Sequence, residues 1–81
     1  MVHMVIGFVL IVTEPNMEKL VYSKLKKNRK VTEIHMLFGE YDIILKTEAK
    51  NYTELGRFVL REVRRVRGVL DTETLTGVGF I

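Results

Sequence analysis

The amino-acid sequence predicts an α+β domain with the ferredoxin-like order βαββαβ, in which one four-stranded antiparallel sheet carries two helices on the same face. Three observations lead to this prediction. The 81 residues fall within the range of one domain. Strand-like and helix-like hydrophobic patterns alternate along the chain, and short turn signals separate them. We therefore expect residues 1–81 to form a single domain.

The first segment, residues 2–13, is expected to form a buried strand. It is rich in β-branched and aromatic residues, and both its odd and its even positions are apolar. Gly7 within this segment indicates a bulge or a close backbone approach. The apolar run is shorter than the roughly 20 residues that a membrane helix needs, so we expect a cytoplasmic protein without a membrane span.

The next segment is expected to form a helix over residues 15–28. Glu14, Pro15 and Asn16 favour a helix start, because proline is tolerated in the first turn and carboxylates favour the amino end. The apolar residues that follow recur at helical spacing and predict one buried stripe, made of Met17, Leu20, Val21 and Leu25.

Residues 31–38 and 41–48 are expected to form a β-hairpin. The first of these two segments alternates apolar and polar side chains, as a strand with one buried face does. The Gly39–Glu40 pair between them indicates a short turn. The hairpin joins two strand-helix-strand units.

A second helix is expected over residues 51–67, followed by a last strand over residues 69–80. Asn51 with Glu54 three positions later matches a helix cap. Gly68 occupies the position after the helix where a left-handed backbone is common. The predicted apolar stripe of this helix consists of Tyr52, Leu55, Val59, Val63 and Val66.

The face of the sheet opposite the helices predicts self-association. It carries half of the first strand and part of the hairpin, and a monomer would expose a larger apolar patch than soluble proteins usually show. Cysteine is absent, so disulfides cannot stabilise this short chain. We therefore expect a second copy to cover the open face and form a dimer.

The charge of the chain passes a loose screen for nucleic-acid binding. The net charge is +3 and the pI is about 9.4. Most of the Lys and Arg residues fall where the two predicted helices end, and cations there complement the helix dipole. We interpret them as solvated helix faces, and nucleic-acid binding by these helix ends stays an alternative. An RNA-recognition module needs adjacent aromatics on its central strands, where this chain offers Phe8 and Tyr41.

The residue types that support catalysis do not combine into a site. His3 and His35 are the only histidines, and neither has an acidic or imidazole partner at ligand spacing. Glu40 and Asp42 could act in acid-base catalysis, but no nucleophile or base adjoins them. We therefore expect no enzyme activity, no cofactor and no metal. The alternative is a small dimeric monooxygenase of the same architecture, with His3, His35 and Tyr41 as the available polar residues.

A polar cluster in apolar surroundings is the candidate ligand site. The hairpin turn supplies backbone amides and carboxylates, and three threonines share one face of the last strand by parity. Hydroxyls, amides and a carboxylate together could bind an amino acid. The alternative is that threonine is simply a good strand residue. The predicted ligand-binding residues are Gly39, Glu40, Tyr41, Asp42, Thr72, Thr74 and Thr76.

At these residues the chain resembles the ligand-sensing module of the leucine-responsive and asparagine-responsive (Lrp/AsnC) regulators, the regulation of amino acid metabolism (RAM) domain. The similarity is close from Phe38 to Thr76 and is one of pattern over the first half. It is carried by Gly39-Glu40-Tyr41-Asp42 leading into residues 43–46, by Tyr52, Leu55 and residues 58–60, and by Gly68-Val69 with Thr72 and Thr74.

The resemblance implies the βαββαβ fold, a dimer with facing sheets, and often a ring of four dimers. It also implies that an effector, usually an amino acid, binds between dimers. The residues that match the family's contacts are Gly39, Tyr41, Asp42, Thr72 and Thr74, and Thr76 is added from parity alone.

One departure from the family concerns DNA. Full-length members carry an amino-terminal helix-turn-helix, whereas this chain starts directly in the first predicted strand. It therefore resembles the stand-alone form, and we expect no direct DNA binding. The leading hypothesis is an oligomeric amino-acid-binding module that modulates transcription or amino-acid metabolism, alone or together with full-length regulators.

Overall fold

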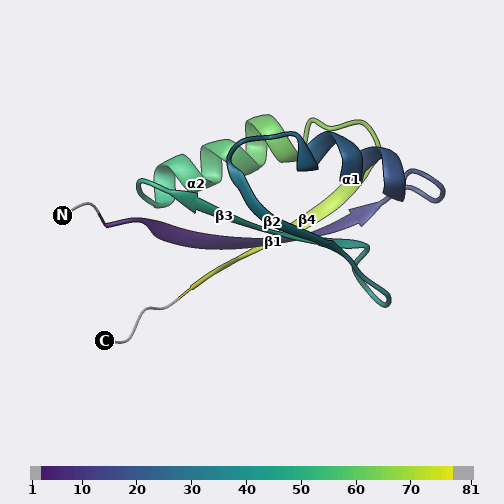
Figure 1. Ribbon diagram of the computed structural model, residues 1–81, viewed down its shortest axis with the longest axis horizontal. Coiled ribbons are helices and arrows are strands. Elements are labelled where there is room, and N and C mark those ends of the chain that lie inside the picture. The colour runs from purple at the N-terminus through teal and green to yellow at the C-terminus, as the bar shows by residue number, and fades with distance from the viewer. Residues whose placement is uncertain (1–2, 78–81) are drawn as a thin grey trace.

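The computed structural model describes residues 3–77, and its elements follow the predicted order (Figure 1). The predicted ends of the first and last strands, at residues 2 and 80, lie outside the described residues. The second helix changes from α-helical to π-helical geometry before it ends. The elements are β1 (Val5–Thr13), α1 (Glu18–Lys26), β2 (Val31–Met36), β3 (Ile43–Ala49), α2 (Tyr52–Phe58), a π-helical segment (Val59–Val63) and β4 (Val69–Thr76).

The four strands form one antiparallel sheet in the order β2-β3-β1-β4. Both helices lie on the same face of this sheet, as Figure 1 shows. The register aligns Ile34, Leu45, Val9 and Thr74 in one row across the four strands. The predicted ferredoxin-like fold is therefore confirmed.

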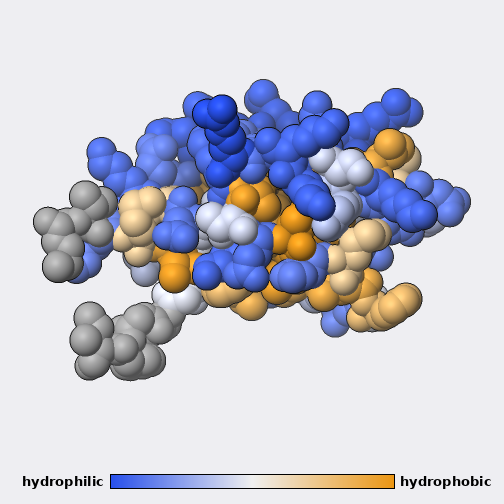
Figure 2. All heavy atoms as spheres, in the orientation of Figure 1, coloured by the Kyte–Doolittle hydropathy of each residue, from blue (hydrophilic) through white to orange (hydrophobic). Residues whose placement is uncertain are grey.

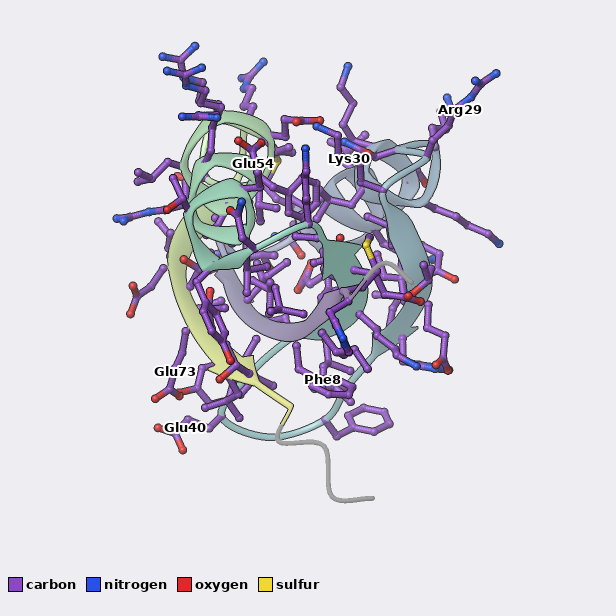
Figure 3. All side chains as sticks on the ribbon, turned by 90° about the vertical axis from the view of Figure 1, so that its left-hand side faces the viewer. Phe8, Arg29, Lys30, Glu40, Glu54 and Glu73 are labelled. Atoms are coloured by element: carbon purple, nitrogen blue, oxygen red, sulfur yellow. The ribbon has the colours of Figure 1, made fainter. Side chains whose placement is uncertain are left out.

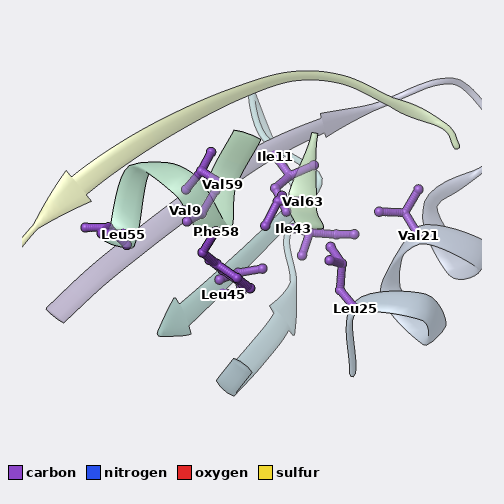
Figure 4. Packing of buried hydrophobic residues seen from close by; sticks show 10 residues of the cluster. All are labelled: Val9, Ile11, Val21, Leu25, Ile43, Leu45, Leu55, Phe58, Val59 and Val63. Atoms are coloured by element: carbon purple, nitrogen blue, oxygen red, sulfur yellow. The ribbon is translucent and has the colours of Figure 1, made fainter. Parts of the chain in front are cut away.

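The core lies between the sheet and the helices (Figure 4). The odd-numbered residues of β1 and β3 point into it, because side chains alternate between the two faces of a strand. Ten hydrophobic residues are buried there: Val9, Ile11, Val21, Leu25, Ile43, Leu45, Leu55, Phe58, Val59 and Val63.

Gly7 permits a close approach between β1 and α2. A Cβ atom at this position would lie 2.5 Å from Cδ1 of Leu55, which is far inside van der Waals contact. The register of β1 does not shift at Gly7, and its irregularity lies between Val12 and Thr13. Of the two interpretations that the sequence allowed, the close approach is the correct one.

The local sequence signals for helix ends are confirmed only in part. The first helix begins at Glu18, three residues later than predicted, because Asn16 adopts a left-handed φ of 70° and holds the preceding residues in a turn. The cap of the second helix is confirmed, since the Glu54 amide donates to Asn51 Oδ1 at 2.8 Å. Gly68 has the expected left-handed φ of 99°, but the second helix ends at Val63, so Gly68 lies in the turn before β4 and not next to the helix end as predicted; its carbonyl accepts a hydrogen bond from the Glu14 amide at 2.8 Å.

Two members of the predicted helical stripes are not in the core. Leu20 is 62% exposed and Tyr52 is 63% exposed. Phe58 fills the space between α2 and the sheet instead, and it is buried. Helical spacing identified the inward face approximately, but it did not define the edges of the stripe.

The open face of the sheet is lined by the even-numbered residues of β1, namely Ile6, Phe8, Leu10 and Val12. Phe8 pairs with Leu75 of β4 and Leu10 pairs with Ile44 of β3, so the apolar row of β1 extends to one neighbouring strand at each level. The partners on the other side, Lys46 of β3 and Glu73 of β4, are charged. Figure 2 shows hydrophilic residues over the helices and hydrophobic residues along the sheet side. Among residues 3–77, no helix has the length and apolar character needed to span a membrane.

Candidate functional site

The turn between β2 and β3 is the centre of the predicted site. The Leu37 amide donates to the Asp42 carbonyl at 2.8 Å, which closes the turn. Gly39 has a φ of 121°, a value that side-chain-bearing residues rarely adopt, and a Cβ there would meet open space. Phe38 is fully exposed beside it. The turn therefore presents backbone amides and an aromatic ring to solvent.

Asp42 fastens this turn to β1. Its Oδ2 accepts hydrogen bonds from the Thr13 amide at 2.8 Å and from the Thr13 hydroxyl at 3.1 Å. The Asp42 amide donates to the Ile11 carbonyl at 2.9 Å. Thr13 is buried, so the carboxylate satisfies polar groups that water cannot reach. Sequence reasoning missed Thr13, because nothing local links two residues 29 positions apart.

Asp42 also lines a hollow on the helix side of the turn. This hollow has a volume of about 530 Å³ and lies between the hairpin turn and the start of α1. Lys19 supplies a cation to its wall, while Glu18 and Asp42 supply carboxylates. Among the described residues, Asp42 Oδ1 has no hydrogen-bond partner, so one oxygen of the carboxylate remains available. Opposite charges around one small hollow suit a zwitterion.

Tyr41 connects the turn to β4. Its hydroxyl donates to Glu73 Oε2 at 2.7 Å, and this hydrogen bond raises the pKa of Tyr41 to about 12, with further contributions from desolvation and from the negative charges of Glu73, Glu40 and Asp71. Figure 3 shows Glu40 and Glu73 at the same corner of the molecule. Glu73 was not predicted as a site residue, because its parity is opposite to that of the strand threonines.

The three strand threonines share one side of the sheet, as parity predicts. Thr72, Thr74 and Thr76 pair with Ile11, Val9 and Gly7 of β1, on the side that faces the helices. Thr72 is half-buried, and the other two are exposed on this edge strand.

The threonines are not equally close to the hairpin turn. Ile11, the partner of Thr72, also pairs with Ile43, the residue after Asp42. Thr76 lies roughly 13 Å farther along β4, at about 3.3 Å per residue. Within one protomer, the structure therefore brings Thr72 near the turn and leaves Thr76 away from it.

The residues required by the monooxygenase alternative do not meet between the sheet and the helices. His3 and His35 are both exposed. His35 lies on the open face, where its Nε2 is 3.5 Å from Glu33 Oε1, so the expectation that it has no acidic neighbour is wrong. The buried polar residues of the described chain are Thr13 and Thr47, and each hydroxyl is hydrogen-bonded. Within residues 3–77, no three acidic or histidine side chains gather as a metal site would need.

The chain is thus a small ferredoxin-like domain, and polar side chains of the turn between β2 and β3 contact both β1 and β4. A comparison with protein families makes the assignment specific. The family model described as "Lrp/AsnC ligand binding domain" matches residues 6–76. The chain therefore belongs to the Lrp/AsnC ligand-binding domain family, which confirms the resemblance seen in the sequence.

Curated relatives agree with this assignment. The chain is 38% identical over 78 residues to an uncharacterized HTH-type transcriptional regulator of Pyrococcus furiosus, covering 93% of this chain and 51% of the relative. It thus spans about half the length of the regulators it matches. A shorter stretch of 44 residues is 43% identical to homocitrate synthase of Sulfolobus acidocaldarius and covers 9% of that enzyme. The relatives matched over most of this chain are transcriptional regulators.

Solved structures share the fold. The crystal structure of FFRP-DM1 superposes with a TM-score of 0.86 at 31% identity, covering 91% of this chain and 99% of that chain. A transcriptional regulator of Neisseria meningitidis, solved as a complex with L-Met, has a TM-score of 0.83 at 19% identity and covers 95% of this chain and 51% of its own.

Proposed function

We propose that this protein binds a free amino acid at the hairpin turn and acts as an oligomeric regulatory module without catalysis of its own. The observation that carries the proposal is the match of a family ligand-binding domain to residues 6–76, and the polar contacts of Tyr41 and Asp42 at the hairpin turn lie within it. The amino acid in the Neisseria meningitidis complex supports the choice of ligand class.

The ligand contacts follow from the charges around the turn. The free Oδ1 of Asp42 holds the ammonium group, since it is an acceptor that no described residue uses. The exposed amides around Gly39 and the Lys19 side chain meet the carboxylate. Tyr41 and Glu40 border the same turn, and Thr72 lies one strand beyond it. The ligand side chain contacts the neighbouring copy.

Self-association is part of the proposal. In a monomer the apolar row on the open face would be exposed to solvent, and a second copy placed sheet to sheet would bury it. The hairpin turns then lie at the rim of the dimer, where further dimers can complete the ligand site with Thr74 and Thr76. We also propose that the module acts in the cytoplasm and joins full-length regulators of its family.

The test is a titration of the wild-type protein with each of the twenty amino acids, followed by calorimetry. We expect at least one to bind with a Kd below about 1 mM, equivalent to roughly 4 kcal/mol. Asp42→Asn keeps an acceptor for Thr13 but removes the charge, so it should weaken binding at least about tenfold while leaving the fold intact.

Glu54→Gln is the matched control, because Glu54 lies in the first turn of α2, on the helix side of the sheet and at the opposite end of β3 from the hairpin turn. The proposed site is wrong if no amino acid binds at millimolar concentration, or if Asp42→Asn and Glu54→Gln bind equally well. Native mass measurement of the same samples tests the oligomer, and a monomer at micromolar protein concentration would exclude the sheet-to-sheet dimer.

A further inference from the structure

The charges of the chain are divided between its two sides. The two helices and their flanking turns, residues 14–30 and 51–67, contain eleven Lys and Arg and four Glu, a formal charge of +7. The rest of the chain contains two Lys and six acidic residues, a formal charge of −4. Figure 3 shows Arg29 and Lys30 on the helix side and Glu40 and Glu73 on the opposite side. The helix side is therefore a cationic surface, although the net charge is small.

A groove with an apolar floor runs through this cationic surface. It has a volume of about 710 Å³ and lies between α1 and the end of the second helical stretch. Leu20 of α1 is 62% exposed at the groove, and the half-buried Met17 and Val66 continue its floor. An exposed leucine alone is common, but here Leu20 lines the same groove as two half-buried apolar residues, and the three together are its apolar strip.

Four cations border the apolar floor, and their charges are not neutralised within the described part of the chain. Lys24 stands on the α1 side, and Arg61, Arg65 and Arg67 stand on the other. The ion pairs between residues 3 and 77 involve other cations.

Among the described residues that line the groove, Glu62 alone is acidic, and it does not offset the four cations. The Glu62 carboxylate accepts hydrogen bonds from Lys30 at 2.6 Å and from Asn28 at 3.0 Å. The Lys30 contact, followed by that with Asn28, lowers the pKa of Glu62. Its charge is therefore compensated by a neighbouring loop, and the groove keeps its positive character.

We propose that this groove docks an acidic amphipathic helix of a partner protein. Apolar side chains of that helix, spaced by about one turn, pack against Leu20 and Met17. Its Asp and Glu residues flank the apolar strip and reach Lys24 on one side and Arg65 on the other. The apolar strip provides the contact area, and the two cationic borders select the charge of the partner.

The groove fits an acidic helix better than nucleic acid or a second copy. A single strand of nucleic acid needs aromatic side chains for base stacking, and none lines the groove. A duplex backbone would leave Leu20 in water. A second copy would bring its own helices, which are cationic as well, and the two helix surfaces would repel each other.

The test uses a fluorescent peptide of about 18 residues, or five helical turns, with leucines along one face and glutamates on both sides of them. A scrambled peptide of the same composition and a labelled DNA duplex are the comparison probes, and anisotropy measures binding to the full chain. Leu20→Asp and Arg65→Glu should each weaken binding of the amphipathic peptide by about tenfold or more.

Matched control variants separate docking from general charge effects. Leu60→Asp changes a leucine that is 59% exposed but outside the groove, and Lys27→Glu reverses an exposed charge outside it. Both should change the Kd by less than about twofold, with circular dichroism confirming that all variants fold. The proposal is overturned if the scrambled peptide or the duplex binds as tightly as the amphipathic peptide. It is also overturned if the amphipathic peptide fails to bind below about 0.1 mM, near 5.5 kcal/mol, or if Leu60→Asp weakens binding as much as Leu20→Asp.

Discussion

Replacing Asp42 by alanine should destabilise the fold as well as remove a ligand contact. The Asp42 carboxylate accepts two hydrogen bonds from Thr13, at 2.8 Å and 3.1 Å. Without this carboxylate, the amide of the buried Thr13 has no acceptor. Hydrogen bonds to charged groups contribute roughly 1.5 to 3 kcal/mol, and an unsatisfied buried donor costs about 1 to 3 kcal/mol. We expect the free energy of unfolding to fall by about 2 to 3 kcal/mol.

The sequence pattern places Asp42 next to the hairpin turn and gives no sign of its contact with Thr13, which lies 29 positions away. Two further variants test the structural explanation. Asp42→Asn keeps an oxygen acceptor for the Thr13 amide, so the loss should be only about 1 kcal/mol. Thr13→Val removes the hydroxyl and keeps the amide, so it should also cost about 1 kcal/mol, and its effect should shrink when Asp42 is already alanine.

Urea unfolding followed by circular dichroism measures these values, at one fixed protomer concentration because an oligomer makes stability concentration-dependent. Lys50→Ala serves as a surface control, because Lys50 is exposed in the loop between β3 and α2, and its expected change is within about 0.5 kcal/mol. An Asp42→Ala protein within that same margin would refute the anchoring role. Loss of amino-acid binding in Asp42→Ala is informative only where the variant remains folded.

Three further predictions concern other contacts. Difference titration between wild type and Tyr41→Phe at 295 nm should show a phenol that ionises near pH 12, and Glu73→Gln should move the pKa of Tyr41 back toward 10. The Tyr41–Glu73 contact stabilises the fold fully below pH 10, and this stabilisation is lost as the pH rises through 12. An unchanged titration in Glu73→Gln would contradict this. Gly7→Ala should lower the free energy of unfolding by about 1 to 3 kcal/mol, because the added methyl group clashes with Leu55. In the Leu55→Ala background, Gly7→Ala should lose most of this effect. Additive effects of the two substitutions in urea unfolding would be inconsistent with the clash. Phe8→Asp should convert the oligomer to folded monomers in sedimentation, and an unchanged mass would show that the open face is not the interface.

The fold was predictable because each local signal agreed with the global pattern. Alternation and helical spacing identified the six elements, and parity separated the two faces of β1 correctly. The structure also decides which of them faces the core: Val9 is fully buried among the core residues, so a charge there would unfold the domain, whereas Phe8 lies on the open face and is the right probe of association.

The site was predictable only in outline, because its key contacts join residues distant in sequence. Tyr41 and Glu73 are 32 positions apart, and Thr13 and Asp42 are 29 apart. Parity states which side of a strand a residue occupies, but only the register states which residue lies opposite. For that reason the threonines of β4 were grouped with the turn, although Thr76 pairs with Gly7 at the far end of the sheet.

The separation of charge between the helices and the sheet changes what the pI means for this molecule. The two shorter dimensions of the domain are 23 Å and 18 Å, and electrostatic interactions decay over about 8 Å at physiological ionic strength. A partner near one side is therefore screened from the opposite side. The pI of about 9.4 reflects only the net charge of the whole molecule. An approaching molecule instead meets either a basic or an acidic surface, and its on-rate depends on which one it reaches.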